Sequence, residues 1–381
     1  MLAQSRVRNV LDRMLSSNRV AHALLFHGPH GAGKRAAALA FAGALQAGSS
    51  SLDASTGDET YGRVQRMLHP DVHVFFPYPR DTSETDIAER LGLLGANPYA
   101  EIDYVRRPSL ADPTKTSNKQ AFYPVKRIND ELKRVMSFRP HEGRYKVAIL
   151  IGADTLRVEA ANAFLKLLEE PAPNTVFILT TSRPDRILPT ILSRCQRVRF
   201  DALAPEVIEH ALVQQRQLDP VQAATIARMA AGSYTRAIEL ASNPRLIEQR
   251  AAVVEFFRVV FAFDGGKLAD FVEQQGKAGR EQTKGFFGLT LAFVRDLMLY
   301  RELRDEAPLV NVDQRATIAR FVDAVPNADL AGMVQMVEEA TYLAERNVHL
   351  TLVLTTLAGA LNQLMHGRSR DTLIPNLMAV G

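Results

Sequence analysis

A glycine-rich stretch near the N-terminus carries the first residues whose types and spacing could do chemistry. The run from Gly28 to Lys34, GPHGAGK, fits the first seven positions of the phosphate-binding pattern G-x-x-x-x-G-K-[ST]. Glycines let backbone N–H groups curl around a phosphate, and the lysine adds a positive charge. An ordinary glycine turn before a helix is the simpler alternative, but the lysine favours a phosphate loop. The candidate nucleotide-binding residues are Gly28, Gly31, Gly33 and Lys34.

The eighth position of this loop carries the wrong chemistry for a metal site. A working loop has a Ser or Thr hydroxyl there to bind Mg²⁺, whereas this chain has Arg35. The apolar run 147–151 also lacks the Asp that ends the equivalent strand in working ATPases and holds the Mg²⁺ shell. Asp154 follows shortly after, and we expect it to cap the next helix instead. Both Mg²⁺ ligands are therefore missing, which predicts no bound metal and no ATP hydrolysis.

Alternating strand and helix patterns must position these residues. Short apolar runs that are typical of buried parallel strands lie at 21–26, 146–151, 175–181 and 197–200. Helical patterns lie between and around them, at 2–18, 34–46, 125–137, 158–170 and 184–192. Strands that alternate with helices predict an α/β fold, with a parallel sheet covered by helices on both faces.

Three domains are expected from the way the pattern changes along the chain. Residues 1–203 form the P-loop-type α/β domain, with a mostly irregular insertion at about 77–122, where the signals are weak and polar. Strand patterns then stop, and 204–245 predicts a small helical lid. Residues 246–381 carry long apolar-periodic helices and predict an all-α collar for oligomerisation. The helix at 350–365 is apolar on more than one face, which suits a bundle shared between subunits.

Composition excludes several classes of protein. The 381 residues are 46% hydrophobic and 23% charged, as in ordinary globular proteins. The chain contains no apolar run of about 18 residues, so no membrane span is expected. The N-terminus lacks the apolar core of a secretory signal. We therefore expect a cytoplasmic protein. The single cysteine, Cys195, cannot form an internal disulfide. A net charge of +4 is too small to indicate nucleic-acid binding by itself.

The stretch from Val147 to Cys195 has the most specific pattern in the chain. Its characteristic pieces are ANAFLK at 161–166, LEEP at 168–171 and Ser193-Arg194-Cys195. Two upstream pieces fit the same pattern, AHALLF at 21–26 and SFRPHEGRYK at 137–146. Together these pieces resemble the bacterial clamp-loader subunits of the AAA+ superfamily, in particular the delta-prime subunits of DNA polymerase III. The resemblance is strong over residues 1–200 and faint in the C-terminal helices.

The resemblance implies a function that the phosphate loop alone does not. Motor subunits of this family carry an Asp-Glu pair where this chain has Ile151-Gly152, and delta-prime members typically lack it. A non-hydrolysing subunit of a DNA-directed DNA polymerase holoenzyme (a nucleotidyltransferase) is therefore implied, helping to open and load the sliding clamp. The implied partners are the gamma/tau-type and delta-type clamp-loader subunits, the clamp and primed DNA, with no membrane.

The same resemblance assigns roles to single residues. Arg194, within the Ser-Arg-Cys piece, is implied as an arginine finger that acts in trans on a neighbouring subunit, although a plain surface arginine is the simpler alternative. Cys195 is expected to be a small buried residue, since no histidine partner is visible. Thr181 is either a sensor residue or an ordinary strand-end threonine. The sensor arginine of the lid falls on Thr235, with Arg236 beside it, which puts contact between lid and nucleotide in doubt.

One departure from the family pattern also bears on which cofactors the chain is expected to bind. The usual four-cysteine zinc module is absent between Gln46 and Pro70, so no zinc is expected. No cofactor is required, and weak ATP or ADP binding at the loop stays open.

Three alternative functions remain. An active gamma/tau-like motor ATPase would need the two missing Mg²⁺ ligands. A P-loop kinase acting on a small molecule would also need them, and gives no reason for the Ser-Arg-Cys piece or the helical tail. A relic AAA+ interaction module unrelated to replication fits the sequence, and only co-purification with a polymerase or clamp would separate it from a clamp-loader subunit.

Overall fold

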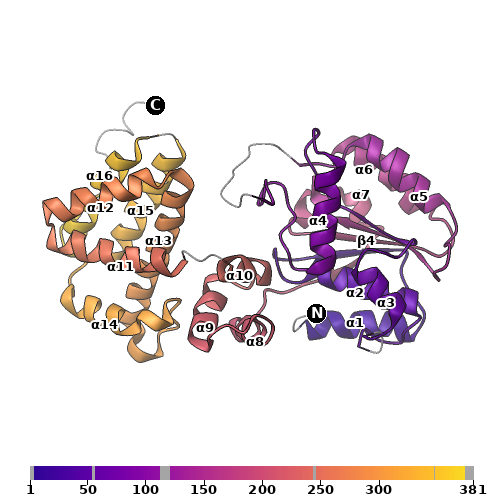
Figure 1. The fold of residues 1–381 in the computed structure, drawn as a ribbon, viewed down its shortest axis with the longest axis horizontal. Coiled ribbons are helices and arrows are strands. Elements are labelled where there is room, and N and C mark those ends of the chain that lie inside the picture. Colours follow the sequence, from indigo (N-terminus) through magenta and orange to yellow (C-terminus); the bar gives the residue numbers. More distant parts are fainter. Residues whose placement is uncertain (1–3, 54–55, 112–120, 243–245, 347, 374–381) are drawn as a thin grey trace. The chain divides into compact units, whose positions relative to one another are not determined.

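The chain forms two compact units in a computed structural model that describes residues 4–53, 56–111, 121–242, 246–346 and 348–373. The first unit comprises Met1–Leu218 with Ala230–Glu239, and the second comprises Asp219–Met229 with Leu240–Gly381. Figure 1 shows a sheet with helices in the first unit and a bundle of helices in the second. The predicted lid, 204–245, contributes to both units, and the three-domain division stays a prediction.

A five-stranded parallel sheet organises the first unit, in the order β2-β3-β4-β1-β5. Its strands are β1 (Ala23–His27), β2 (Val72–Phe75), β3 (Lys146–Ile151), β4 (Thr175–Thr181) and β5 (Gln196–Arg199). The strand before the phosphate loop, β1, pairs with β4 on one side and β5 on the other, so His27 lies beside Thr181 and Arg199. The carboxyl ends of these strands share one edge, where open α/β sheets bind ligands.

Helices cover both faces of this sheet. They are α1 (Ser5–Ser16), α2 (Lys34–Ala47), α3 (Glu59–Gln65), α4 (Glu84–Ala96), the π-helical η1 (Arg127–Leu132), α5 (Lys133–Ser137), α6 (Val158–Glu169) and α7 (Pro189–Leu192). The first unit also contains α8 (Pro205–Arg216) and most of α10 (Tyr234–Ala241), which contribute no residue to the apolar cores on the two faces of the sheet. Alternate residues of β1 point to opposite layers: Leu24 and Phe26 pack with α1 and α2, whereas Leu25 packs with η1 and α6. This arrangement confirms the predicted α/β fold, a parallel sheet with helices on both faces.

One strand and two α-helices of the first unit, β2, α3 and α4, were not predicted. Strand β2 is a short edge strand whose first three residues are only partly buried, so its apolar signal is weak. Helix α4 lies within 77–122, so the expectation of an irregular insertion is wrong for its 13 residues. Ser83 caps this helix by accepting the N–H of Asp86 at 3.2 Å, and acidic residues occupy the first turn. The helix buries only Arg90 and Leu94, which gives it little apolar period.

The second unit is entirely helical where the structure describes it. Its main helices are α9 (Pro220–Met229), α11 (Leu246–Ala262), α12 (Gly265–Lys277), α13 (Arg280–Leu303), α14 (Arg315–Ala324), α15 (Leu330–Glu345) and α16 (Leu350–Met365). One apolar core joins α11 to α16, and α16 buries residues on several sides, including Val353, Leu357 and Leu361. Among the described residues, no helix combines the length and apolar character needed to cross a bilayer.

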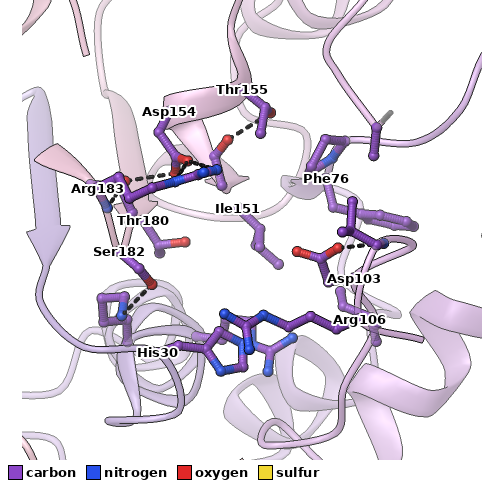
Figure 2. Close-up of a pocket in the computed structure, with 18 of the residues that line it drawn as sticks. His30, Phe76, Asp103, Arg106, Ile151, Asp154, Thr155, Thr180, Ser182 and Arg183 are labelled. Carbon is purple, nitrogen blue, oxygen red and sulfur yellow. Dashed lines mark hydrogen bonds and ion pairs between the residues drawn. The ribbon is translucent and has the colours of Figure 1, made fainter. Parts of the chain in front are cut away.

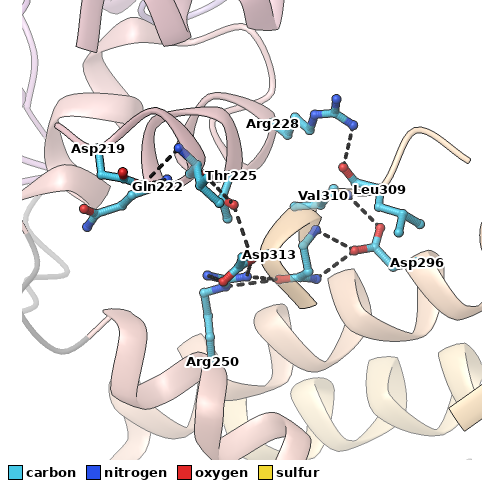
Figure 3. A network of polar contacts seen from close by, with 11 residues as sticks. Asp219, Gln222, Thr225, Arg228, Arg250, Asp296, Leu309, Val310 and Asp313 are labelled. Atoms are coloured by element: carbon cyan, nitrogen blue, oxygen red, sulfur yellow. Dashed lines mark hydrogen bonds and ion pairs between the residues drawn. The ribbon is translucent and has the colours of Figure 1, made fainter. Parts of the chain in front are cut away.

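A polar network ties α9 to the rest of the second unit (Figure 3). Arg250, which is 7% exposed, donates to both carboxylate oxygens of Asp313 at 2.6 and 3.0 Å and to Asn311 Oδ1 at 2.9 and 3.1 Å. Thr225 of α9 donates to Asp313 at 3.3 Å. Asp296, fully buried, accepts the backbone and side-chain N–H groups of Asn311 at 2.7 and 2.8 Å. The buried groups among them, Arg250, Thr225, Asn311 and Asp296, therefore each have a partner, as stability requires.

Candidate functional site

The phosphate loop lies between β1 and α2, as its pattern predicted. Its three glycines have φ of 143°, 74° and 96°, values that side chains with a Cβ rarely adopt. A Cβ on Gly28 would lie 2.1 Å from the carbonyl oxygen of Phe200, and a Cβ on Gly31 would lie 1.9 Å from Ser233 Oγ. The N–H of Tyr234 also donates to the Gly31 carbonyl at 3.1 Å. Glycine is therefore needed for both curvature and close packing.

Lys34 points back onto its own loop. Its Nζ donates to the carbonyls of Gly28 at 2.7 Å and Pro29 at 2.6 Å, and lies 3.3 Å from Ser182 Oγ. Burial, and then the charge of Arg35, lowers the pKa of Lys34 to about 7. The amine that would contact a nucleotide phosphate is therefore occupied by loop carbonyls and is partly neutral near pH 7.

Arg35 stands where a working loop holds Mg²⁺ with a hydroxyl. Its side chain is 12% exposed, with Nη1 3.8 Å from Glu101 Oε1 and Nη2 3.5 Å from Thr235 Oγ1. Glu101, from the segment 77–122, also lies 3.0 Å from His30 Nε2. Burial alone would raise the pKa of Glu101, but the hydrogen bond from His30 and the charge of Arg35 lower it to about 2. A buried carboxylate therefore balances the loop's cations.

A cavity of about 690 Å³ lies beside this cluster, at the carboxyl ends of β3 and β4 (Figure 2). This volume is in the range of small-molecule sites. Figure 2 shows Arg106 extending toward His30, with Ile151 and Asp154 across the cavity. The charged residues that line it are Lys34, Arg35, Arg106, Arg157, Arg183 and Arg186 on the basic side and Glu101, Asp103 and Asp154 on the acidic side. The basic excess favours an anionic ligand.

The end of β3 is where a working ATPase carries the Asp that holds Mg²⁺, and this chain has Ile151 there. Ile151 lines the cavity, and Asp154 lies in the following 3₁₀ turn, η2 (Ala153–Thr155). The prediction that Asp154 caps the next helix is wrong, because α6 has no side-chain cap. Asp154 instead accepts hydrogen bonds from Thr181 Oγ1 at 2.7 Å and from Arg183 Nε at 2.8 Å. Thr181 contacts Oδ1 of Asp154, and Arg183 contacts Oδ2 through both Nε and Nη2. Both carboxylate oxygens of Asp154 are therefore already engaged.

Thr181, the candidate sensor residue, ends β4 at the same cavity and is 2% exposed. Its hydroxyl donates to Asp154 and accepts the N–H of Arg183 at 2.9 Å. A hydroxyl has one proton to donate, and Asp154 uses it. The sensor role of Thr181 stays a prediction, and it would require this hydrogen bond to change.

Arg194 does not line the cavity and lies in the loop after α7. Its Nη2 is 2.8 Å from Glu169 Oε1, and its Nη1 donates to the Thr190 carbonyl at 3.0 Å. The side chains of Arg194 and Glu169 are 37% and 50% exposed, so their pairing contributes little to stability and can be exchanged. Burial raises the pKa of neighbouring Cys195 to about 11, so this thiol is not a nucleophile at neutral pH.

The residues around the loop fit an anion but do not fit a Mg²⁺-nucleotide. Arg35 brings a cation to the metal position, and Ile151 brings no carboxylate. Within the part of the chain that the structure describes, no group of three or more His, Cys, Asp or Glu residues could hold a metal ion. The expectations of no zinc and no metal stay predictions.

Known proteins supply an independent line of evidence on the family. Residues 3–204, which are 202 of the 381 residues, match the family described as DNA polymerase III, delta subunit. The chain belongs to that family. The DNA polymerase III subunit delta' of Bacillus subtilis (strain 168) is 28% identical over 300 residues, which cover 79% of this chain and 77% of that protein. The predicted resemblance to the delta-prime subunits of DNA polymerase III is confirmed.

Two further relatives have the same sequence identity to this chain. The subunit delta' of Pseudomonas aeruginosa is 28% identical over 236 residues, covering 62% of this chain and 60% of that protein. The subunit tau of Bacillus subtilis is 28% identical over 364 residues, covering 89% of this chain but only 56% of its own length. The chain is thus similar to both delta' and tau subunits of this polymerase.

Sequence reasoning missed two residues of this site: Glu101, the carboxylate beside Arg35, and His30, which pairs with Glu101. His30 occupies a position of the loop pattern that any residue can take, so the pattern carries no signal for it. Glu101 lies in the segment with the weakest periodicity. The one available signal was Arg35 itself, because a cation placed at the metal position of the loop needs an anion nearby.

Proposed function

We propose that this chain is a non-hydrolysing, delta-prime-like subunit of the DNA polymerase III clamp loader. It joins gamma/tau-type and delta-type subunits in the cytoplasm, helps to open the sliding clamp and helps to load it on primed DNA. One observation carries the proposal: a single unit combines a phosphate loop whose metal position holds Arg35 with an exposed guanidinium at Arg194. The similarity to delta' and tau subunits supports it.

Arg194 is the residue through which the chain acts on its neighbour. During phosphoryl transfer, charge spreads over the γ-phosphoryl oxygens, and a positioned guanidinium stabilises it in a water-poor interface. The Thr190 carbonyl and Glu169 hold Arg194 from two sides, so Glu169 is a positioning residue in this proposal. Lysine would not replace Arg194 well, because it lacks the planar fork that meets two oxygens at once.

The loop of this chain binds ATP or ADP weakly, without Mg²⁺ and without turnover. Lys34 and the positively charged lining of the cavity favour a polyphosphate. Because Arg35 brings charge but no metal ligand, binding of this kind does not organise an attacking water. The nucleotide is therefore optional for the chain, and no cofactor is required.

A gamma/tau-like motor is the second candidate, because the Bacillus subtilis tau subunit matches 89% of the chain. The chemistry at Arg35 and Ile151 argues against it, since both positions lack the oxygen ligands that Mg²⁺ needs. A relic interaction module unrelated to replication is the remaining alternative, and it predicts no association with clamp-loader subunits.

Reconstitution of the complex tests the proposal. The gamma/tau-type and delta-type subunits of the same organism are purified with and without the full chain, and clamp loading on primed DNA is measured. We expect a complex that contains all three subunits and loads the clamp only when the chain is present. A chain that fails to join the others, or a complex that loads equally well without it, would contradict the proposal. Mg²⁺-dependent turnover by the chain alone would favour the motor.

A further inference from the structure

A carboxylate from a distant segment contacts the residues of the phosphate loop that would face a phosphate. Glu101 is 1% exposed on its side chain, and its oxygens lie 3.0 Å from His30 Nε2 and 3.8 Å from Arg35 Nη1. His30 is part of the loop, and Arg35 stands at its metal position. A working loop has Mg²⁺ and a phosphate oxygen at this place, and this chain has a guanidinium and a carboxylate oxygen.

We propose that Arg35 and Glu101 are an internal substitute for Mg²⁺ and phosphate, and that Glu101 competes with nucleotide phosphate for this loop. Carboxylate and phosphate are both anionic acceptors, and the single N–H of His30 Nε2, which faces Glu101 at 3.0 Å, cannot be donated to both at once. A nucleotide binds only when Glu101 leaves. This inference rests on the proposed weak binding of ATP or ADP and names the residue that controls it.

The segment around Glu101 holds its carboxylate toward the loop. The N–H of Asp103 donates to Glu101 Oε1 at 3.1 Å, and the Asp103 carboxylate accepts the N–H of Val105 at 2.7 Å. Figure 2 shows Asp103 and Arg106 of this segment beside the cavity, with Arg106 extending toward His30. The segment that supplies the competing carboxylate therefore also forms part of the lining of the anion-favouring cavity.

Charge explains why Glu101 stays in place until another anion arrives. A buried carboxylate without a partner is strongly unfavourable, and so is a buried guanidinium. Arg35 and Glu101 satisfy each other only partly, because the closest approach of their charged atoms is 3.8 Å. A polyphosphate could neutralise Arg35 and contact Lys34 as well, while the cavity of about 690 Å³ gives the displaced carboxylate room to reach water.

Calorimetric titration of the full chain with ATP and with ADP, in the presence of EDTA, tests the inference. The variant Glu101→Gln keeps the size of the side chain and removes its charge. We expect it to bind nucleotide about tenfold more tightly than the unaltered chain, since a charge-assisted contact no longer has to be broken. The matched control is Asp103→Asn, which removes a carboxylate from the same cavity but leaves the contacts of Glu101 with His30 and Arg35 in place.

The outcomes separate this inference from the proposed weak binding. If Glu101→Gln binds nucleotide and the unaltered chain does not, the inference holds and the proposed weak binding of the unaltered chain is wrong. If the variant and the unaltered chain bind equally tightly, the inference is overturned and the weak binding stands. If neither protein binds nucleotide, the inference and the proposed weak binding are both wrong. An equal gain from Asp103→Asn would show a general charge effect and would also overturn the inference.

A second variant covers the case in which Glu101→Gln does not fold. Glu101→Asp keeps the charge but shortens the side chain by one methylene, so its carboxylate no longer reaches His30. It should also bind ATP and ADP more tightly than the unaltered chain. Unchanged affinity in a folded Glu101→Asp protein would contradict the proposed competition.

Discussion

Arg35 in the first unit and Arg250 in the second are both buried guanidinium groups, but they are satisfied to different degrees. Arg250 makes two hydrogen bonds to Asp313 and two to Asn311, at 2.6 to 3.1 Å. Arg35 has a carboxylate oxygen at 3.8 Å and a hydroxyl at 3.5 Å, and it lines a cavity. The bidentate pair of Arg250 with Asp313 has a structural role, because its hydrogen bonds are already made within the fold. The longer pair of Arg35 with Glu101 lies beside a cavity, so Arg35 can exchange this carboxylate for the anion of a ligand.

The largest expected effect is the loss of the tight pair. Arg250→Ala leaves the buried Asn311 side chain and the more exposed Asp313 carboxylate without their main donor, and we expect the second unit to lose about 2–3 kcal/mol of stability. Hydrogen exchange of α11 and α13 measures this loss directly. Arg258→Ala is the control, because Arg258 makes an exposed pair with Glu255 at 3.5 Å and should change stability by less than about 1 kcal/mol. If Arg250→Ala and Arg258→Ala lost similar stability, the buried pair of Arg250 would be no more important than an exposed pair, which would contradict this prediction.

Lys34 gives the first unit a pH dependence that is the next largest effect. Its folded pKa of about 7 lies below the ordinary value of 10.5, so the unfolded chain binds more protons between these two values. Stability should therefore rise with pH from 7 to 9, by on the order of 1–2 kcal/mol. Urea midpoints of the chain and of Lys34→Met, compared across this range, measure the effect. A slope that survives in Lys34→Met would assign it to another group.

Glu101 should produce an effect of comparable size at acid pH. Its folded pKa of about 2 lies below the ordinary 4.5, so its contribution is present above pH 4.5 and is lost as pH falls toward 2. We expect the loss to be on the order of 1–3 kcal/mol, and Glu101→Gln should not show it. Thermal melting of both proteins between pH 5 and pH 3 measures the difference. Identical acid sensitivity would mean that Glu101 is not paired as the structure shows.

The smallest expected signal is ATP turnover by the isolated chain, which should be absent. Neither Arg35 nor Ile151 can bind Mg²⁺, so phosphate release with Mg²⁺ should equal that of a Lys34→Ala control. The variant Arg35→Thr restores the hydroxyl alone and should also show no turnover, because the β3 carboxylate is still missing. Turnover by the unaltered chain above the control would contradict the account of the loop.

The sheet and the long helices could be predicted because their apolar periods are strong. Buried runs such as 146–151 and 175–181 coincide with strands β3 and β4. Helix α4 could not be predicted, since it buries little, and strand β2 is short and lies at an edge. Patterns of apolar residues report burial and are silent about polar groups that are buried in pairs.

The loop residues of the candidate site were predictable for a different reason, since they form a local pattern. Gly28, Gly31, Gly33 and Lys34 fall within seven consecutive positions, and the structure places them between β1 and α2. Glu101 could not be found in this way, because it reaches Arg35 only through the fold. The contact between Arg194 and Glu169 is likewise a product of the fold, although both residues lie in characteristic pieces of the sequence.

The central claim is that this chain contributes chemistry to its neighbour through Arg194 and none through its own loop. The most direct test measures ATP hydrolysis by the reconstituted clamp loader, with clamp and primed DNA, when the chain carries Arg194→Ala. The matched control is Arg63→Ala, because Arg63 pairs with Glu142 at 2.7 Å and the two are 35% and 38% exposed. We expect a complex of normal composition whose hydrolysis falls with Arg194→Ala and is unchanged with Arg63→Ala. Unchanged hydrolysis with Arg194→Ala would contradict the claim.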